Sequence, residues 1–478
     1  MNINRQIKNL FFITISFFCT CVMVGDLLYV ITGNIIQLTT FFIIGYIALF
    51  LRQVINGNLL SLYSFYLLTS SFFMYDKFLV GPYLGKGVMT INFAGSYTFP
   101  DWVGEKFVFI ASISIIVIDI IYTVFRFKNS KMFNDKLDID TVEEKRFYCK
   151  LGLIIMSIFI IPILYKIILQ IKFQKSFANY AVANFTSQKD TTVYPWWTKG
   201  SGTFFTIGFL LFLYSFPSEK KARIGYFLYF LLMFTTAFKG GRAFFFTYLL
   251  SIPLLYKKIY NKSLSVFGMF LLGLILIAIG IILGNFRSNL ITKVQKGIIA
   301  NFLYGQTTTM GVPYVYLENN GNIPYKHYPF ILTYLINPIR SFFVHVNGGI
   351  IEKMEQSNNY GTIALYMLNP NLVKNGGGLG LNFLTEAYDC FGFIGVFFWS
   401  TLLGLIIKFV DTIKYSNKNR RLIVTVFFVY QYTLFLPRHS FFGITDHLKY
   451  IIMFYLVYYI ITKWKILFNT QDKIRGLN

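Results

Sequence analysis

Charged residues are scarce in this chain of 478 residues, and their scarcity excludes a soluble globular domain. Only 13% of the residues are Asp, Glu, Lys or Arg, about half of the roughly 25% that a water-soluble protein carries. Hydrophobic residues make up 55%, and the mean hydropathy is +0.56. The apolar residues form runs of roughly 17 to 25, the length that crosses a bilayer as a helix. The chain is therefore predicted to be an all-α, polytopic transmembrane bundle.

Cysteines are few, and the familiar catalytic motifs are missing. The four cysteines have neither the spacing of metal ligands nor the pattern of a disulfide framework. No P-loop, GxSxG or HExxH motif occurs, and the first predicted outer gap has no acidic pair for a metal-using lipid-linked transferase. The sequence predicts no metal site and no cofactor.

The net charge of +24 does not indicate nucleic-acid binding, because the basic residues lie in short gaps between apolar runs. More than half of the 44 Lys and Arg residues fall in every second gap. The positive-inside rule then places both termini in the cytoplasm, with lipid headgroups as a further partner. The predicted spans, about twelve, are 9–32, 35–51, 58–75, 107–125, 151–171, 201–217, 224–238, 241–256, 264–286, 388–408, 422–437 and 446–464.

One long loop divides this pattern into three parts: spans one to nine (1–286), an extracytoplasmic loop (287–380), and spans ten to twelve with a cytoplasmic tail (381–478). A loop of this length is usually functional or disordered, and its many Tyr, Phe, Ile and Leu residues argue against disorder. We expect a partly helical cap, with surface-lying helices at 289–303 and 328–343.

Four arginines are predicted to face the outer side, against the positive-inside trend. Arg242 lies in KGGRAFF, Arg287 in GNFRSN, Arg340 in NPIRSFF and Arg438 in LPRHSFF. Arginine is always charged and presents a fork of donors that fits phosphate oxygens. Several such side chains around one cavity would suit a diphosphate, although each alone could equally extend to a lipid headgroup or pair with an acid.

Three residues are candidates for a general base near the same side. Glu386 lies in LNFLTEAYDCFGFIG, His345 in the long loop, and His439 next to Arg438. A hydroxyl that attacks an anomeric carbon needs a carboxylate or imidazole as proton acceptor. The competing interpretation is a helix-start carboxylate for Glu386 and interfacial histidines for the other two. Asp26 and Lys166 lie within predicted spans, where they could pair with each other.

These residues resemble the O-antigen polymerase family, often called Wzy proteins, over roughly 240–445. The resemblance depends on KGGRA before an apolar helix, GNFR at the next outer end, the long outer loop, EAYDCFGFIG, and a further arginine at a helix end. Some members carry arginine and glycine with ten residues between them. Here Arg287 precedes Gly297 at a shorter spacing, and Arg340 precedes Gly348 and Gly349, so that signature is not met.

The resemblance implies a metal-independent glycosyltransferase of the GT-C type in the bacterial cytoplasmic membrane. Its substrate would be an oligosaccharide linked to undecaprenyl diphosphate, and a Wzz-type chain-length regulator is an implied partner. Arg242, Arg287 and Arg438 would stabilise the leaving diphosphate, with Arg340 assisting. Two alternatives stay open: an O-antigen ligase, which uses a loop histidine as base, and a flippase or transporter, which would place its substrate near the membrane midplane.

Overall fold

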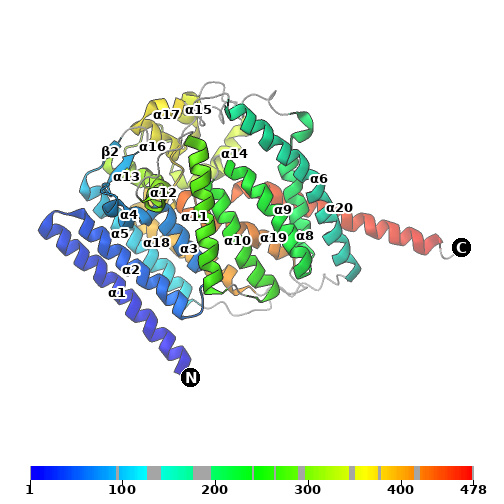
Figure 1. Ribbon diagram of the computed structural model, residues 1–478, viewed down its shortest axis with the longest axis horizontal. Coiled ribbons are helices and arrows are strands. Elements are labelled where there is room, and N and C mark those ends of the chain that lie inside the picture. Colours follow the sequence, from blue (N-terminus) through cyan, green and yellow to red (C-terminus); the bar gives the residue numbers. More distant parts are fainter. Residues whose placement is uncertain are drawn as a thin grey trace.

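The computed structural model is a bundle of α-helices with one small two-stranded hairpin among its described residues (Figure 1). The residues described are 2–92, 96–125, 142–175, 195–238, 242–262, 265–288, 297–343, 350–374, 378–413 and 420–475.

The first group of helices lies at the left of Figure 1 and includes most of the N-terminal third. Its elements are α1 (Asn2–Thr32), α2 (Ile35–Ile55), α3 (Leu62–Ser70), the π-helical turn η1 (Ser71–Tyr75), α4 (Asp76–Tyr83), α5 (Asp101–Val124) and α18 (Phe383–Thr412). α1 packs along α2, and α5 packs along α18. The α1–α2 pair is close because position 45 is glycine: a Cβ there would lie 2.7 Å from the Phe18 ring.

The second group lies at the right of Figure 1. Its helices are α6 (Val142–Lys175), α8 (Ser201–Tyr214), α9 (Glu219–Phe238), α10 (Arg242–Tyr260), α19 (Arg421–Phe435) and α20 (Thr445–Arg475). The predicted break at KGGR is confirmed, because α9 ends at Phe238 and α10 begins at Arg242. α11 (Val266–Ser288) crosses the centre of the view, and α19 contacts α3 and so joins the two groups.

The segment after α11 is largely helical where it is described, and its helices lie at the top of Figure 1. They are α12 (Ile298–Gln306), α13 (Gly311–Glu318), α14 (Thr333–Phe343), α15 (Ile350–Ser357), α16 (Tyr360–Leu368) and α17 (Pro370–Lys374). α12 overlaps the predicted helix 289–303, of which residues 289–296 lie outside the described residues, and α14 matches the predicted helix 328–343 but starts later, at Thr333. The sequence did not predict α13, α15, α16 or α17, nor the antiparallel strands β1 (Thr90–Asn92) and β2 (Ser96–Thr98).

Every predicted span overlaps a helical segment, and among the described residues five helices are long and apolar enough to cross a membrane. These five are Asn9–Thr32, Ile35–Ile55, Asp101–Val124, Val142–Leu169 and Phe383–Thr412. The total of twelve stays a prediction, and α20 runs across the other helices in Figure 1 instead of along them.

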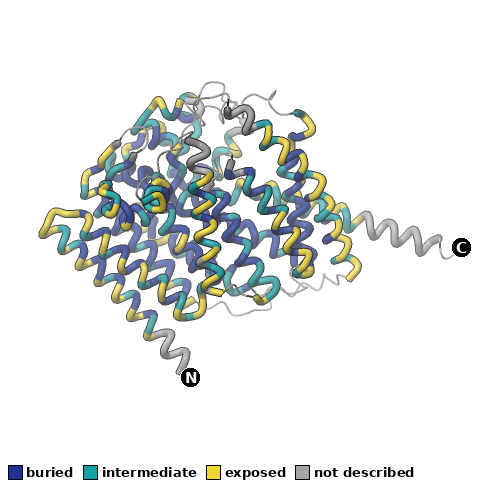
Figure 2. The backbone as a smooth tube through the Cα atoms, viewed as in Figure 1, coloured by how far each residue is buried: buried dark blue, intermediate teal, exposed yellow. Residues whose placement is uncertain are grey.

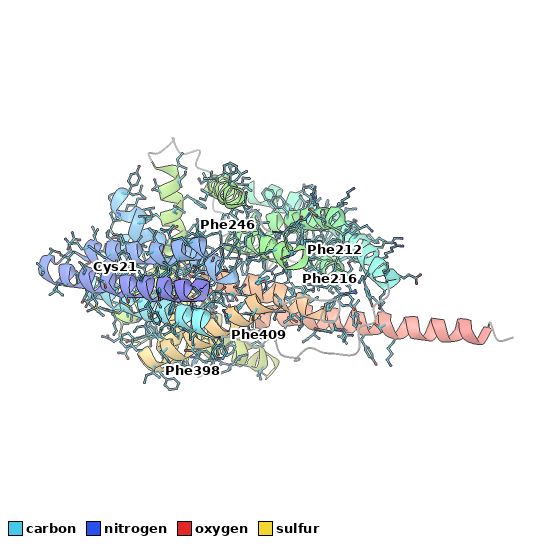
Figure 3. All side chains as sticks on the ribbon, turned by 90° about the horizontal axis from the view of Figure 1, so that it is seen from below. Cys21, Phe212, Phe216, Phe246, Phe398 and Phe409 are labelled. Carbon is cyan, nitrogen blue, oxygen red and sulfur yellow. The ribbon has the colours of Figure 1, made fainter. Side chains whose placement is uncertain are left out.

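Large apolar side chains cover the outside of the bundle. Met23 and Ile394 are 71% and 76% exposed, and Figure 2 shows exposed residues along the outer helices. Figure 3 shows the same contrast among the aromatic side chains: Phe398 lies at the margin, whereas Phe212 is enclosed by helices. An apolar outer surface of this extent fits contact with lipid.

A buried ion pair joins helices of the first group. Arg52 of α2 bonds both carboxylate oxygens of Asp119 on α5, with its Nη1 donating to Oδ2 at 3.0 Å. The same Nη1 donates to Thr14 of α1, and the Tyr63 hydroxyl of α3 donates to Asp119 at 2.8 Å. Both charged side chains are almost completely buried. One polar network therefore connects four helices.

α18 is not a continuous helix. Phe391 (φ −153°, ψ 35°) and Gly392 (φ 61°, ψ −137°) have non-helical dihedrals, which separate a short first segment carrying Glu386 from a longer second one. The positive φ at position 392 favours glycine. A Cβ at Gly395 would lie 2.2 Å from the Ala387 carbonyl oxygen, so glycine is also required where the segments meet.

The structure does not support the alternative in which Asp26 pairs with Lys166. Asp26 is on α1 and Lys166 is on α6, and Figure 1 places these helices on opposite sides of the molecule. Lys166 instead lines a cavity of the second group.

We expect Arg52→Ala to lower the free energy of unfolding by about 3–5 kcal/mol, because it leaves Asp119 buried without its charge partner. Unfolding in mixed detergent micelles, followed by circular dichroism against increasing dodecyl sulfate, measures the change. Arg223→Ala is the matched control: Arg223 pairs with Glu219 but is 75% exposed, so its loss should cost less than about 1 kcal/mol. Equal stability of the Arg52 variant and the wild type would contradict the assignment.

Candidate functional site

A cavity of about 240 Å³ lies where α10, α19 and α20 converge. We call it the His439 cavity. It is lined by Phe244 and Tyr248 of α10, Gln431, Tyr432 and Phe435 of α19, His439 and Gly443 of the connecting turn, and Asp446, His447, Lys449 and Tyr450 of α20. Aromatic walls with a few convergent polar groups are typical of small-molecule sites.

A second cavity of about 250 Å³ adjoins the first. We call it the Lys166 cavity. The two share Tyr248, Gln431, His447 and Tyr450 as common walls. The second is further lined by Ile163 and Lys166 of α6, Ser201, Gly202 and Thr206 of α8, Tyr229, Leu232, Met233 and Thr235 of α9, and Phe428 of α19. The two cavities together are large enough to hold more than one sugar ring.

The turn between α19 and α20 is held by Glu386. The Ser440 hydroxyl and the Phe441 backbone N–H both donate to Oε2 of Glu386 at 2.9 Å. Glu386 is 1% exposed and does not line either cavity. The backbone N–H of Leu381 donates to the Arg438 carbonyl at 3.4 Å, which adds a second attachment to the residues before α18. Glu386 therefore fixes the backbone that carries Arg438 and His439.

His439 presents its imidazole to the first cavity between aromatic rings. The Tyr334 hydroxyl of α14 lies 3.5 Å from Nε2, and Phe435 stacks at a tilt with ring centroids 4.9 Å apart. The ring also lies directly on Gly443, where a Cβ would be 2.0 Å from Nδ1. Burial lowers the pKa of His439 to about 4. Its imidazole is therefore neutral at pH 7, the form that accepts a proton.

The structure places the predicted arginines in different surroundings. Arg438 follows directly on α19 and donates from Nη1 to the Gln306 carbonyl at 3.5 Å, beside the Phe73 ring. Arg340 donates from Nη1 to the Gln356 carbonyl at 2.7 Å, which caps the last turn of α15. Arg438 is thus next in sequence to His439, which lines the cavity, whereas the Arg340 guanidinium bonds a backbone carbonyl within the cap.

Two predicted residues are placed only in part, and a third lies outside the described residues. Arg242 is the first residue of α10, less than two turns before Tyr248 of the cavity wall, and Arg287 is the penultimate residue of α11. The positions of these two side chains lie outside what the structure describes, as does all of His345.

Sequence reasoning missed Asp446, His447, Lys449 and Lys166 as cavity residues. TDHLK at the start of α20 places three ionisable groups within its first two turns. A signal was present, because charged residues just inside an apolar run are unusual. Within the described ranges, no group of three or more His, Cys, Asp or Glu side chains forms a metal-binding cluster.

The family model for O-antigen polysaccharide polymerase Wzy matches residues 6–469, nearly the whole chain. The chain belongs to the Wzy family. It is therefore an integral membrane protein and a polymerase of glycosyltransferase type in polysaccharide biosynthesis. Among curated proteins and solved structures, no match to this Wzy-family chain was found.

The match confirms the family predicted from the residues and extends it to both ends. The motifs that carried the resemblance covered only roughly 240–445, whereas the matched range also includes the first group of helices. In this Wzy-family chain, α6 and α8 supply residues that line the Lys166 cavity. The N-terminal half therefore contributes side chains to the candidate site.

We expect Glu386→Gln to keep most polymerising activity and Glu386→Leu to lose about 10-fold or more, since only the leucine removes the acceptor of both hydrogen bonds. Chain length of the glycan on gels, normalised to protein level, measures both. If Glu386 were itself the base, the glutamine variant would be as inactive as the leucine variant.

Proposed function

We propose that the protein polymerises oligosaccharide repeat units carried on undecaprenyl diphosphate, at the outer face of the bacterial cytoplasmic membrane. Both termini would lie in the cytoplasm. The growing glycan passes from its carrier to the non-reducing end of a new unit, with inversion and without a metal. The single observation that carries this proposal is the pair of adjoining, aromatic-walled cavities at the helix ends that also carry Arg242, Arg438 and His439.

Catalysis in this proposal needs two groups on opposite sides of the anomeric carbon. A hydroxyl oxygen of the acceptor bonds to that carbon while the bond to the carrier diphosphate breaks. The electron pair of the broken bond goes to a diphosphate oxygen, and the hydroxyl proton goes to a base. His439 is the proposed base, because it lines the cavity in its neutral form. Glu386 acts through the turn that it holds.

Arginine is suited to the leaving group, because its charge is fixed and its fork matches phosphate oxygens. We assign this role to Arg438, which adjoins His439, and to Arg242 and Arg287, which lie at the ends of α10 and α11. Arg340 contributes less, since its bond of 2.7 Å to the Gln356 carbonyl holds it within the cap, whereas the bond from Arg438 to the Gln306 carbonyl is longer, at 3.5 Å.

We expect Ala at Arg242, Arg287 or Arg438 each to lower polymerisation by about 100-fold or more, because the leaving charge loses a charge-assisted donor. Chain-length ladders from cells with matched protein levels measure the loss. Arg223→Ala, an exposed arginine on α9, is the control and should leave the ladder unchanged. Long chains from all three variants would refute the arginine assignment.

A strain deleted for the gene distinguishes polymerase from flippase. Loss of a polymerase leaves single repeat units that are still exported and that appear on the cell surface. Loss of a flippase leaves them inside the cell. Accumulation on the cytoplasmic side alone would overturn the proposed function.

The pKa of His439 gives a pH test. We expect His439→Gln to lose about 100-fold or more. Because burial lowers the pKa of His439 to about 4, the wild-type imidazole stays neutral as the pH falls through 6.5. The ratio of wild-type to variant activity in proteoliposomes should therefore be constant between about pH 5.5 and about pH 8. A ratio that falls along an ordinary histidine titration near pH 6.5 would contradict this.

A further inference from the structure

Lys166 lies near the C-terminal end of Val142–Leu169, a helix long and apolar enough to cross a membrane. Ionisable residues at such positions are costly in lipid and nearly always face a cavity, a partner or a substrate path. Lys166 follows this rule, because it lines the Lys166 cavity between α6, α8 and α9. Its position predicts a role toward whatever enters that cavity.

The other lining groups of the Lys166 cavity are suited to a sugar. Its hydroxyl and amide side chains are Ser201, Thr206, Thr235 and Gln431, and its rings are Tyr229, Tyr248, Phe428, His447 and Tyr450. Hydroxyl and amide groups exchange hydrogen bonds with sugar hydroxyls, and aromatic faces pack against the C–H face of a pyranose.

The walls are held in place before any ligand binds. Phe428 stacks on His447 at 5.0 Å and on Tyr450 at 6.0 Å between ring centroids. Gln431 donates from Nε2 to the Tyr229 hydroxyl at 2.6 Å. A preformed wall lowers the cost of ordering on binding.

The charged residues that line the Lys166 cavity indicate which class of sugar it can bind. Among the described residues that line this cavity, Lys166 is the one Lys, Arg, Asp or Glu. Asp446 and Lys449 line the neighbouring His439 cavity instead. A diphosphate carries several negative charges and is better matched by several arginine forks. One ammonium group beside aromatic and hydroxyl groups matches a sugar that carries one carboxylate.

We propose that the Lys166 cavity binds a carboxylate-bearing sugar of the repeat unit, such as a uronic acid, with the Lys166 ammonium group on its carboxylate. This specificity rests on the proposed polymerase function and narrows its substrate class to acidic glycans. The cavity adjoins the His439 cavity, so the acidic sugar would lie next to the reacting residue of the same glycan.

The first test is the composition of the repeat unit extracted from the deletion strain. The proposal requires a sugar with a carboxylate in that unit. A unit without any carboxylate overturns it and leaves the polymerase function intact.

The second test is a cycle of two proteins and two substrates in proteoliposomes. The substrates are the extracted lipid-linked unit and the same unit with its carboxyl groups reduced to alcohols. We expect wild type to elongate the reduced unit about 10- to 100-fold more slowly than the native one. Lys166→Met should elongate both at the same low rate, and Lys166→Arg should stay close to wild type. Two results would overturn the proposal. One is that wild type elongates both substrates at equal rates. The other is that Lys166→Met is slower than wild type by the same factor on the reduced unit as on the native unit.

A binding measurement separates this proposal from the function on which it rests. If wild type elongates neither substrate, the polymerase proposal fails. Calorimetry of the full-length protein in nanodiscs with the released glycan then decides alone. Tighter binding of native than of reduced glycan by wild type, absent in Lys166→Met, supports the proposal, and equal binding of both refutes it.

Discussion

The site depends on one hydrogen-bonded attachment, that of Glu386 to the turn between α19 and α20. The carboxylate accepts bonds from Ser440 and Phe441, and Tyr432 of α19 bonds the carbonyls of the same two residues. Buried polar groups are costly unless they are bonded, so the turn has few alternative conformations. From this turn, Arg438 reaches the Gln306 carbonyl at the end of α12, and His439 lines the cavity.

Hydrogen bonds and ion pairs tie the helices together at places away from the cavities. Arg52, Asp119 and Tyr63 form one network, and Asp411 accepts bonds from the first N–H groups of α3. Lys258 of α10 also bonds the backbone at the end of α18. None of these five residues lines either cavity. The contacts that hold these helices together therefore leave the cavities open.

Hydropathy predicted where helices lie, because burial in lipid demands continuous apolar helices. It placed the break at KGGR and identified the turn that carries Arg438 and His439. It could not predict which helix ends converge, so it left a pairing of Lys166 with Asp26 open and overlooked Asp446 and His447. It also missed α13, whose Val312, Tyr314 and Val315 are buried against α5 and α16. A helix of eight residues that is apolar on every side until its final Glu318 gives no periodic signal of its own.

The interruption of α18 at Phe391–Gly392 affects how the helix can adapt to bilayers of different thickness. A hydrophobic helix meets a thicker or thinner membrane by changing its tilt. A straight α18 would transmit that tilt to Glu386 and so to the turn. Because the dihedrals at Phe391 and Gly392 are not helical, the two segments of α18 need not share one tilt. The kink would thereby make the position of Glu386 less sensitive to bilayer thickness than it would be on a straight helix.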